Sequence, residues 1–122
     1  MKPEFKVIVA GSRHFSDFDL MVDRCDFFLK EKIVTHRVVI VSGTAKGADQ
    51  LGEKYAELRG LSVMKFRPNW NKLGNMAGIV RNAEMLEVSD STIVFWDGSS
   101  RGSQHMISIT KRSGKPLRVV RF

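Results

Sequence analysis

The sequence predicts an α/β fold: a single Rossmann-like three-layer domain over residues 1–122, built on a mostly parallel five-stranded sheet. Short apolar segments rich in β-branched residues alternate with longer amphipathic segments, which is the pattern of strands joined by crossover helices. Three of the short segments stop abruptly in turns of glycine and hydroxyl residues. Such junctions are typical of a doubly wound sheet with right-handed crossovers.

The first strand is predicted at residues 6–10, a short apolar run of the kind that is buried on both faces. A helix is predicted at residues 17–31, where Ser16 and Asp19 resemble a capping box with Asp in place of Glu. The side of this helix that faces the sheet is expected to carry Met21, Cys25, Phe28 and Leu29.

A second strand is predicted at residues 37–41, followed by a helix whose apolar residues recur every three or four positions. Gly60 stands where a left-handed residue commonly ends a helix. A third strand is predicted at residues 61–66, and Pro68 closes it. The apolar positions of this second helix are Ala48, Leu51, Tyr55 and Leu58.

Residues 67–78 are rich in Pro, Asn, Trp and Gly and are predicted to form a loop. A fourth strand is expected at residues 91–96, then a helix that ends at Gly114, then a short final strand at residues 116–122. The third helix, between the loop and the fourth strand, is marked by Met76, Ile79, Val80, Ala83 and Leu86.

Length and composition suit one compact domain whose core needs neither disulfides nor metal. Cys25, the single cysteine, is expected to be a small buried hydrophobe and not a reactive thiol. One cysteine and no signal peptide favour a cytoplasmic protein, and no apolar run approaches the ~18 residues of a membrane span. Because no pair of Cys or His has metal-ligand spacing, neither a metal nor a cofactor is predicted.

The net charge of +7 is unevenly distributed. Residues 1–60 hold ten Lys and Arg against nine Asp and Glu, whereas residues 61–122 hold ten against four. The excess is scattered, without a block of like charges. A basic second half suits an anionic ligand, steers nucleic acid or keeps the surface soluble, and composition leaves these open.

The three turns after strands are residues 11–13, 42–47 and 97–103. One glycine turn is ordinarily structural, but three at the carboxyl edge of one sheet favour a pocket where backbone N–H groups hold a phosphate. We expect the phosphate on the backbone of residues 43–47 and 98–103. The predicted ligand-binding residues are Gly11, Ser12, Arg13, Ser42, Gly43, Thr44, Lys46, Gly47, Asp49, Trp70, Arg81, Asn82, Asp97, Gly98, Ser99, Gly102 and Ser103.

Several of these side chains have a structural alternative. Arg13 pairs with a phosphate or is a solvated loop residue, and Arg81 and Asn82 contact ligand or form a polar stripe on their helix. Asp49 holds a ribose hydroxyl or simply meets the positive end of a helix. Trp70, in the loop, is the better candidate for stacking on a base.

Familiar nucleotide fingerprints are missing. The second turn lacks the Lys-Ser/Thr of a P-loop, and the first lacks the G-x-G-x-x-G of dinucleotide folds. An ordinary ATPase, GTPase or dehydrogenase is therefore disfavoured. Asp97 and His105 are the candidate catalytic residues, although a lone histidine in the first turn of a helix is more often structural.

Motifs follow in order along nearly the whole chain: Gly11-Ser-Arg13, Ser42-Gly-Thr-Ala-Lys-Gly-Ala-Asp49, Pro68-x-Trp70, Ala77-Gly-x-x-Arg-Asn82-x-x-Met85 and Phe95-Trp-Asp-Gly-Ser-x-x-Gly102-Ser-x-His105. Together they resemble the SLOG superfamily, and more narrowly its small YspA/YpsA-related branch, common in bacteria and phages. The resemblance implies a Rossmann-like domain that binds nucleotides or their derivatives, and a homodimer or higher homo-oligomer. Relatives include the lonely-guy phosphoribohydrolases and the DNA-processing protein A family.

One departure concerns catalysis. Lonely-guy enzymes carry a Pro-Gly-Gly-x-Gly-Thr-x-x-Glu turn whose glutamate serves the hydrolysis. Aligning Gly102 and Ser103 with its Gly-Thr pair puts Met106 at the glutamate position. Asp97, Asp49 or Glu84 would have to substitute, so the binding features are retained without the family's acid/base.

Three hypotheses follow. The first is a binding module that senses, sequesters or presents a nucleotide or nucleotide-derived small molecule. The second is an enzyme, a nucleoside-monophosphate phosphoribohydrolase or related N-glycosidase. The third is single-stranded nucleic-acid binding, suggested by the basic second half.

Overall fold

The computed structural model describes residues 1–122 and contains one five-stranded sheet in the order β3-β2-β1-β4-β5. Every neighbouring pair of strands is parallel, and β1 is central, with Ile8 beside Val41 on one side and Thr92 on the other. The strands are β1 Glu4–Gly11, β2 Arg37–Ser42, β3 Ser62–Lys65, β4 Ser91–Trp96 and β5 Leu117–Arg121. The predicted α/β Rossmann-like fold is confirmed.

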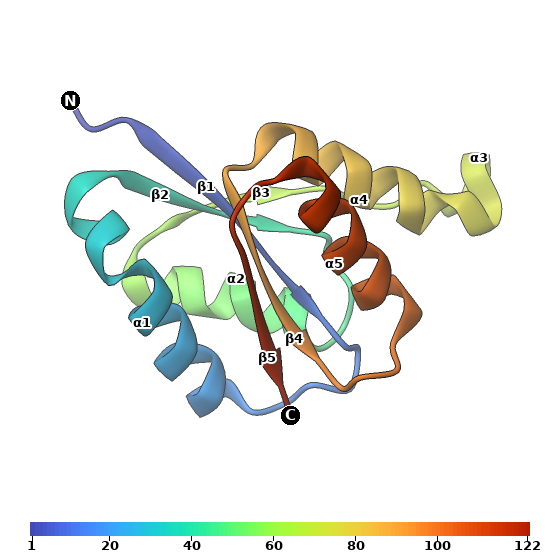
Figure 1. The fold of residues 1–122 in the computed structure, drawn as a ribbon, viewed down its shortest axis with the longest axis horizontal. Helices are drawn as coiled ribbons and strands as arrows, with labels where there is room; N and C mark the ends of the chain where they lie inside the picture. Colours follow the sequence, from blue (N-terminus) through green and yellow to red (C-terminus); the bar gives the residue numbers. More distant parts are fainter.

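Helices cover both faces of the sheet (Figure 1). Alternate residues of β1 point to opposite faces, so Val7 and Val9 join one core cluster and Ile8 and Ala10 the other. The first cluster includes residues of α1 and α2, and the second includes residues of α4 and α5. The bounds are α1 Phe18–Thr35, α2 Ala48–Arg59, α4 Ala77–Val88 and α5 Arg101–Ser113.

The helices at the first two crossovers form largely as expected. In α1, Met21, Cys25 and Leu29 are buried, but the capping side chain is Asp17, which accepts from Leu20 N–H, and not Ser16. Gly60 ends α2 in the left-handed conformation. Leu58, predicted as part of the apolar stripe of α2, is instead exposed, because Gly52 and Ala56 make the contact with the sheet.

The segment predicted as a loop contains a short helix, α3 Trp70–Leu73, and a 3-10 turn, Gly74–Met76. The Asn69 side chain caps α3 by accepting from Lys72 N–H, and Gly74, with φ of 54°, ends it. This local chemistry is why the prediction of a plain loop was wrong. Figure 1 shows α3 at the end of α4 that lies away from the sheet.

Helix α4 presents a face other than the one its apolar residues suggest. Met76 and Ile79 are exposed. Asn82, a polar residue, is buried together with Ala77, Met85 and Leu86. Asn82 occupies the inner face because its side chain finds polar partners there, which are described below.

None of the helices combines the length and the apolar character that crossing a membrane requires.

Candidate functional site

The first turn (residues 11–13), the second turn (42–47) and the third turn (97–103) meet at the carboxyl edge of three adjacent strands, β2, β1 and β4. Ser12 connects them. Its N–H donates to Phe95 O at 2.9 Å, its hydroxyl oxygen accepts from Asp97 N–H at 3.2 Å, and its carbonyl accepts from Ala48 N–H at 3.3 Å. Ser12 is fully buried, so its role in the structure is to hold the turns together.

A cleft of about 430 Å³ opens beside these turns, here called the main cleft. Of the residues predicted from the sequence, it is lined by Gly11, Arg13, Asp49, Arg81, Asn82, Asp97, Gly102 and Ser103. A second hollow of about 450 Å³, here called the side lobe, shares Arg13, Ala45 and Arg81 with it. The side lobe adds the predicted residues Gly43, Thr44, Lys46 and Trp70.

Other predicted residues line neither hollow: Ser12, Ser42, Gly47, Gly98, Ser99 and His105. His105 lies behind Asn82, whose Nδ2 is 3.1 Å from the histidine Nδ1. Burial, with Arg112 nearby, lowers the pKa of His105. This geometry does not bring the two predicted catalytic residues together, because Asp97 lines the main cleft and His105 does not.

Sequence reasoning did not name the side chains of His14 and Arg101 in the main cleft or that of Arg67 in the side lobe, although it expected phosphate on the backbone of residues 98–103. His14 directly follows the first turn, and Arg101 lies within the third. Their position beside a glycine turn was the available signal. Arg67 offers no comparable signal, because only the course of the chain after β3 brings it to the edge of the second turn.

The second turn uses two of its own N–H groups. Thr44 N–H donates to Ser42 Oγ at 3.1 Å, and Ala45 N–H donates to Asp49 Oδ2 at 3.1 Å. Thr44 has φ of 67°, a conformation that a β-branched residue rarely adopts. Gly47, with φ of 79°, packs so closely on the first turn that a Cβ there would lie 2.3 Å from Arg13 O.

Asp49 is the buried carboxylate of the site, with 4% of its surface exposed. Burial raises its pKa to about 6, against the opposing effects of the hydrogen bond from Ala45 and the charges of Arg81 and Arg13. Oδ2 is held by Ala45, whereas Oδ1 makes no hydrogen bond within the protein. Since Asp49 lines the main cleft, Oδ1 is an acceptor open to a ligand.

Arg81 and Asn82 of α4 link the second turn to the third. Arg81 Nη1 donates to Gly43 O at 2.6 Å, and its Nε donates to Asn82 Oδ1 at 3.1 Å. Asn82 Nδ2 in turn donates to Gly102 O at 3.3 Å. Gly43 allows this approach, because a Cβ there would lie 2.8 Å from Asp49 Oδ2 and 2.9 Å from Arg81 Nη1.

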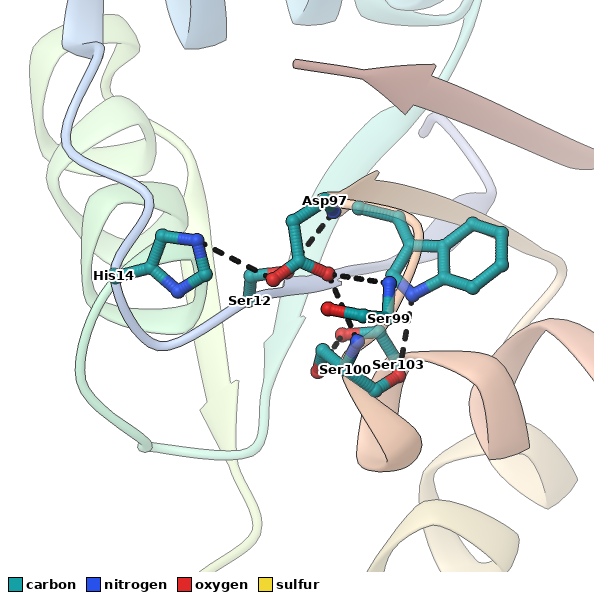
Figure 2. A network of polar contacts seen from close by, with 7 residues as sticks. Ser12, His14, Asp97, Ser99, Ser100 and Ser103 are labelled. Carbon is teal, nitrogen blue, oxygen red and sulfur yellow. Dashed lines mark hydrogen bonds and ion pairs between the residues drawn. The ribbon is translucent and has the colours of Figure 1, made fainter.

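Figure 2 shows how Asp97 organises the third turn. Its Oδ1 accepts from Ser99 N–H at 2.9 Å and from Ser100 N–H at 2.8 Å, and its Oδ2 lies 3.3 Å from His14 Nε2. The two backbone donors hold the pKa of Asp97 below its usual range. Asp97 is therefore a carboxylate at neutral pH.

The first turn of α5 leaves its backbone donors free. The N–H groups of Arg101, Gly102 and Ser103 have no acceptor within the protein, and all three residues line the main cleft. Such N–H groups at the start of a helix carry partial positive charge, and the first turn of α5 contains no acidic residue to offset it. The arrangement can bind an anion.

Comparison with known proteins places the chain among its relatives. A family model described as the "YspA, cpYpsA-related SLOG family" matches residues 5–73, which include the first and second turns. Gene 61 protein of Mycobacterium phage D29 is 29% identical over 118 residues, covering 92% of this chain and 93% of that protein.

Two solved structures share the fold. DNA processing protein A (DprA) from Streptococcus pneumoniae has a TM-score of 0.71 at 21% identity. The match covers 97% of this chain but only 50% of that chain. A structural-genomics target, TM1055, has a TM-score of 0.62 at 20% identity, over 96% of this chain and 72% of that one. With a family model matching more than half of its residues, the chain belongs to the YspA, cpYpsA-related SLOG family.

Proposed function

We propose that residues 1–122 form one nucleotide-binding domain, which holds a nucleotide or nucleotide-derived ligand in the main cleft as a sensing, sequestering or ligand-presenting module. One observation carries this proposal: the unpaired N–H groups of Arg101, Gly102 and Ser103 and the guanidinium of Arg13 line the same cleft. Backbone N–H groups at a helix start together with an arginine are a general way to hold a phosphate.

The phosphate position follows from which donors are free. In the second turn, the N–H groups of Thr44 and Ala45 are engaged by Ser42 and Asp49, and the free N–H groups of Gly43, Lys46 and Gly47 belong to residues outside the main cleft. The free N–H groups of α5 belong to residues that line the main cleft, so we assign its phosphate to the start of α5. Arg13 makes no hydrogen bond or ion pair within the protein, which leaves its side chain available as the counter-charge.

The sugar position follows from Asp49. Its Oδ1 accepts no hydrogen bond within the protein and is reached from the main cleft, so it can accept one from a donor on a ligand. A ribose hydroxyl in the main cleft supplies that donor. Membership of the SLOG family, whose members bind nucleotides and their derivatives, supports the same ligand class.

Isothermal titration calorimetry with AMP tests the proposal, using the unaltered chain, Arg13→Ala and Lys111→Ala. Arg13→Ala is expected to weaken AMP binding by about tenfold or more, because a charge-assisted hydrogen bond contributes about 1.5–3 kcal/mol. Lys111→Ala removes the same charge from an exposed position of α5 outside the cleft and is expected to leave affinity unchanged.

Equal losses in both variants would mean that the ligand responds only to net charge. No binding of AMP, ADP or a 5′-phosphorylated dinucleotide to the unaltered chain would contradict the proposal. Size-exclusion chromatography with light scattering tests the homo-oligomer that the family resemblance implies.

A second candidate function, cleavage of an N-glycosidic bond, is favoured by the contact between His14 and Asp97 at the main cleft. Asp97 is an ionised carboxylate and does not supply a proton at neutral pH. In this scheme His14 therefore exchanges a proton with the substrate, and Asp97 orients the His14 ring. Met106, at the position of the lonely-guy glutamate, is buried and apolar.

Incubation with nucleoside monophosphates, followed by chromatography for released base, tests this candidate. Released base that disappears in His14→Ala and Asp97→Asn would support it. Binding of a nucleoside monophosphate without release of its base would contradict cleavage and support the binding function alone.

A further inference from the structure

The side lobe differs from the main cleft in its charge. No carboxylate lines the side lobe. Four cationic side chains line it: Arg13, Lys46, Arg67 and Arg81. The main cleft, by contrast, has Asp49 and Asp97 among its arginines. A hollow of about 450 Å³ with this lining is large enough for part of a small anionic molecule.

The cations of the side lobe form no ion pair within the protein. Arg81 donates only to Gly43 O and Asn82 Oδ1, which are uncharged, and none of the four forms an ion pair. The charge of Asp49 acts on Arg13 and Arg81, which leaves Lys46 and Arg67 uncompensated.

Glu53 does not fill this need. It lines a neighbouring hollow that Arg67 also lines, but there it accepts from Ser42 Oγ at 2.6 Å and pairs with Lys65 Nζ at 3.5 Å, and it forms no ion pair with Arg67. Like charges gathered in one hollow repel one another, and a bound anion removes that cost.

The wall of the side lobe also offers an aromatic surface on which a nucleotide base can stack. Trp70, at the start of α3, is 49% exposed and lines the lobe beside Pro68. A large aromatic face left open beside cations offers stacking to a base while the cations hold the attached phosphate.

The two hollows are adjacent, because Arg13, Ala45 and Arg81 line both. An anion in each would therefore lie on either side of the same two arginines. We infer that the ligand is a small nucleotide with two phosphoryl groups, of the size of a nucleoside bisphosphate or a dinucleotide. One phosphate occupies the main cleft, the other lies against Lys46 and Arg67, and a base stacks on Trp70. This inference rests on the proposed function and adds the second anionic group.

Calorimetry with two probes tests it: AMP, and the 5′-phosphorylated dinucleotide pApA. The unaltered chain is expected to bind pApA at least tenfold more tightly than AMP. Arg67→Ala is expected to abolish that advantage while leaving AMP affinity unchanged, and Lys111→Ala is expected to preserve both. The Arg67 side chain makes no hydrogen bond or ion pair within the protein. The melting temperature of the Arg67→Ala variant is therefore expected to equal that of the unaltered chain.

The outcomes separate the two proposals. If neither probe binds, the proposed function fails. If AMP and pApA bind equally, or if Arg67→Ala weakens both by the same factor, the second anionic subsite is wrong while nucleotide binding stands. If affinity keeps rising from pApA to an eight-nucleotide strand and falls steeply with salt, the ligand is single-stranded nucleic acid and the inference is overturned.

Discussion

The second turn, Ser-Gly-Thr-Ala-Lys-Gly, and the third turn, Asp-Gly-Ser-Ser-Arg-Gly-Ser, have similar compositions, and each leads from a strand into a helix. In each turn a carboxylate accepts from backbone N–H groups while other N–H groups stay free, but the free groups belong to residues that line different hollows. In the second, Asp49 follows the turn and reaches back to Ala45 N–H. In the third, Asp97 begins the turn and accepts from Ser99 and Ser100, and the N–H groups at the start of α5 stay free beside the main cleft. The free N–H groups of Gly43 and Lys46 in the second turn lie instead beside the side lobe.

The difference teaches that glycine and hydroxyl residues mark where a chain turns but do not say which donors remain for a ligand. That depends on where a carboxylate stands relative to the turn. Asp49 holds Ala45 N–H of the second turn, and Asp97 holds Ser99 and Ser100 N–H of the third, where the next three N–H groups belong to residues that line the main cleft.

The largest effect is expected from matched glycine substitutions in the two turns. Gly47→Ala puts a Cβ at positive φ and 2.3 Å from Arg13 O, whereas a Cβ at Gly102 meets nothing within 4 Å. We expect Gly47→Ala to lower the free energy of unfolding by about 3 kcal/mol or more, and Gly102→Ala to change it by about 0.5 kcal/mol or less. Urea denaturation measures both, and similar losses would contradict the difference in packing between Gly47 and Gly102.

A smaller effect concerns Asp49. Because burial raises its pKa to about 6 from 3.8, the native state keeps a proton that the unfolded chain has lost between these pH values. The unaltered chain therefore loses stability as pH rises from about 4 to about 6. Asp49→Asn keeps an acceptor for Ala45 N–H and avoids this loss. The stability difference between Asp49→Asn and the unaltered chain is expected to grow by about 1–3 kcal/mol over that range. Parallel pH curves for the two chains would contradict the expectation.

The smallest effect is expected at His14. The histidine contact with Asp97 is largely exposed, whereas the two N–H groups that Asp97 accepts from are part of the turn itself. We expect Asp97→Ala to lower the melting temperature measurably and His14→Ala to leave it within experimental error. Equal shifts in thermal melts would mean that the ion pair, and not the backbone capping, orders the third turn.

Much of the fold followed from local pattern. The alternation of short apolar segments with longer amphipathic ones located all five strands, and Gly60 and Gly114 ended their helices in the left-handed conformation as glycines at those positions commonly do. The orientation of α4 did not follow. Its apolar residues favour one face, but Asn82 faces inward because its side chain contacts Gly102 O and His105 there. Both of these partners belong to α5.

The candidate site divides in the same way. The sequence by itself determined which segments turn at the edge of the sheet, because the alternation of strands and glycine turns is a local property. Only the tertiary structure decided the role of each residue within them: Ser12 joins the turns, Asp49 holds Ala45 N–H, and the N–H groups at the start of α5 stay free beside the main cleft. Hydrogen bonds between residues far apart in the chain determine which backbone N–H groups of the turns are engaged and which are free. The order of residues along the chain does not show these bonds.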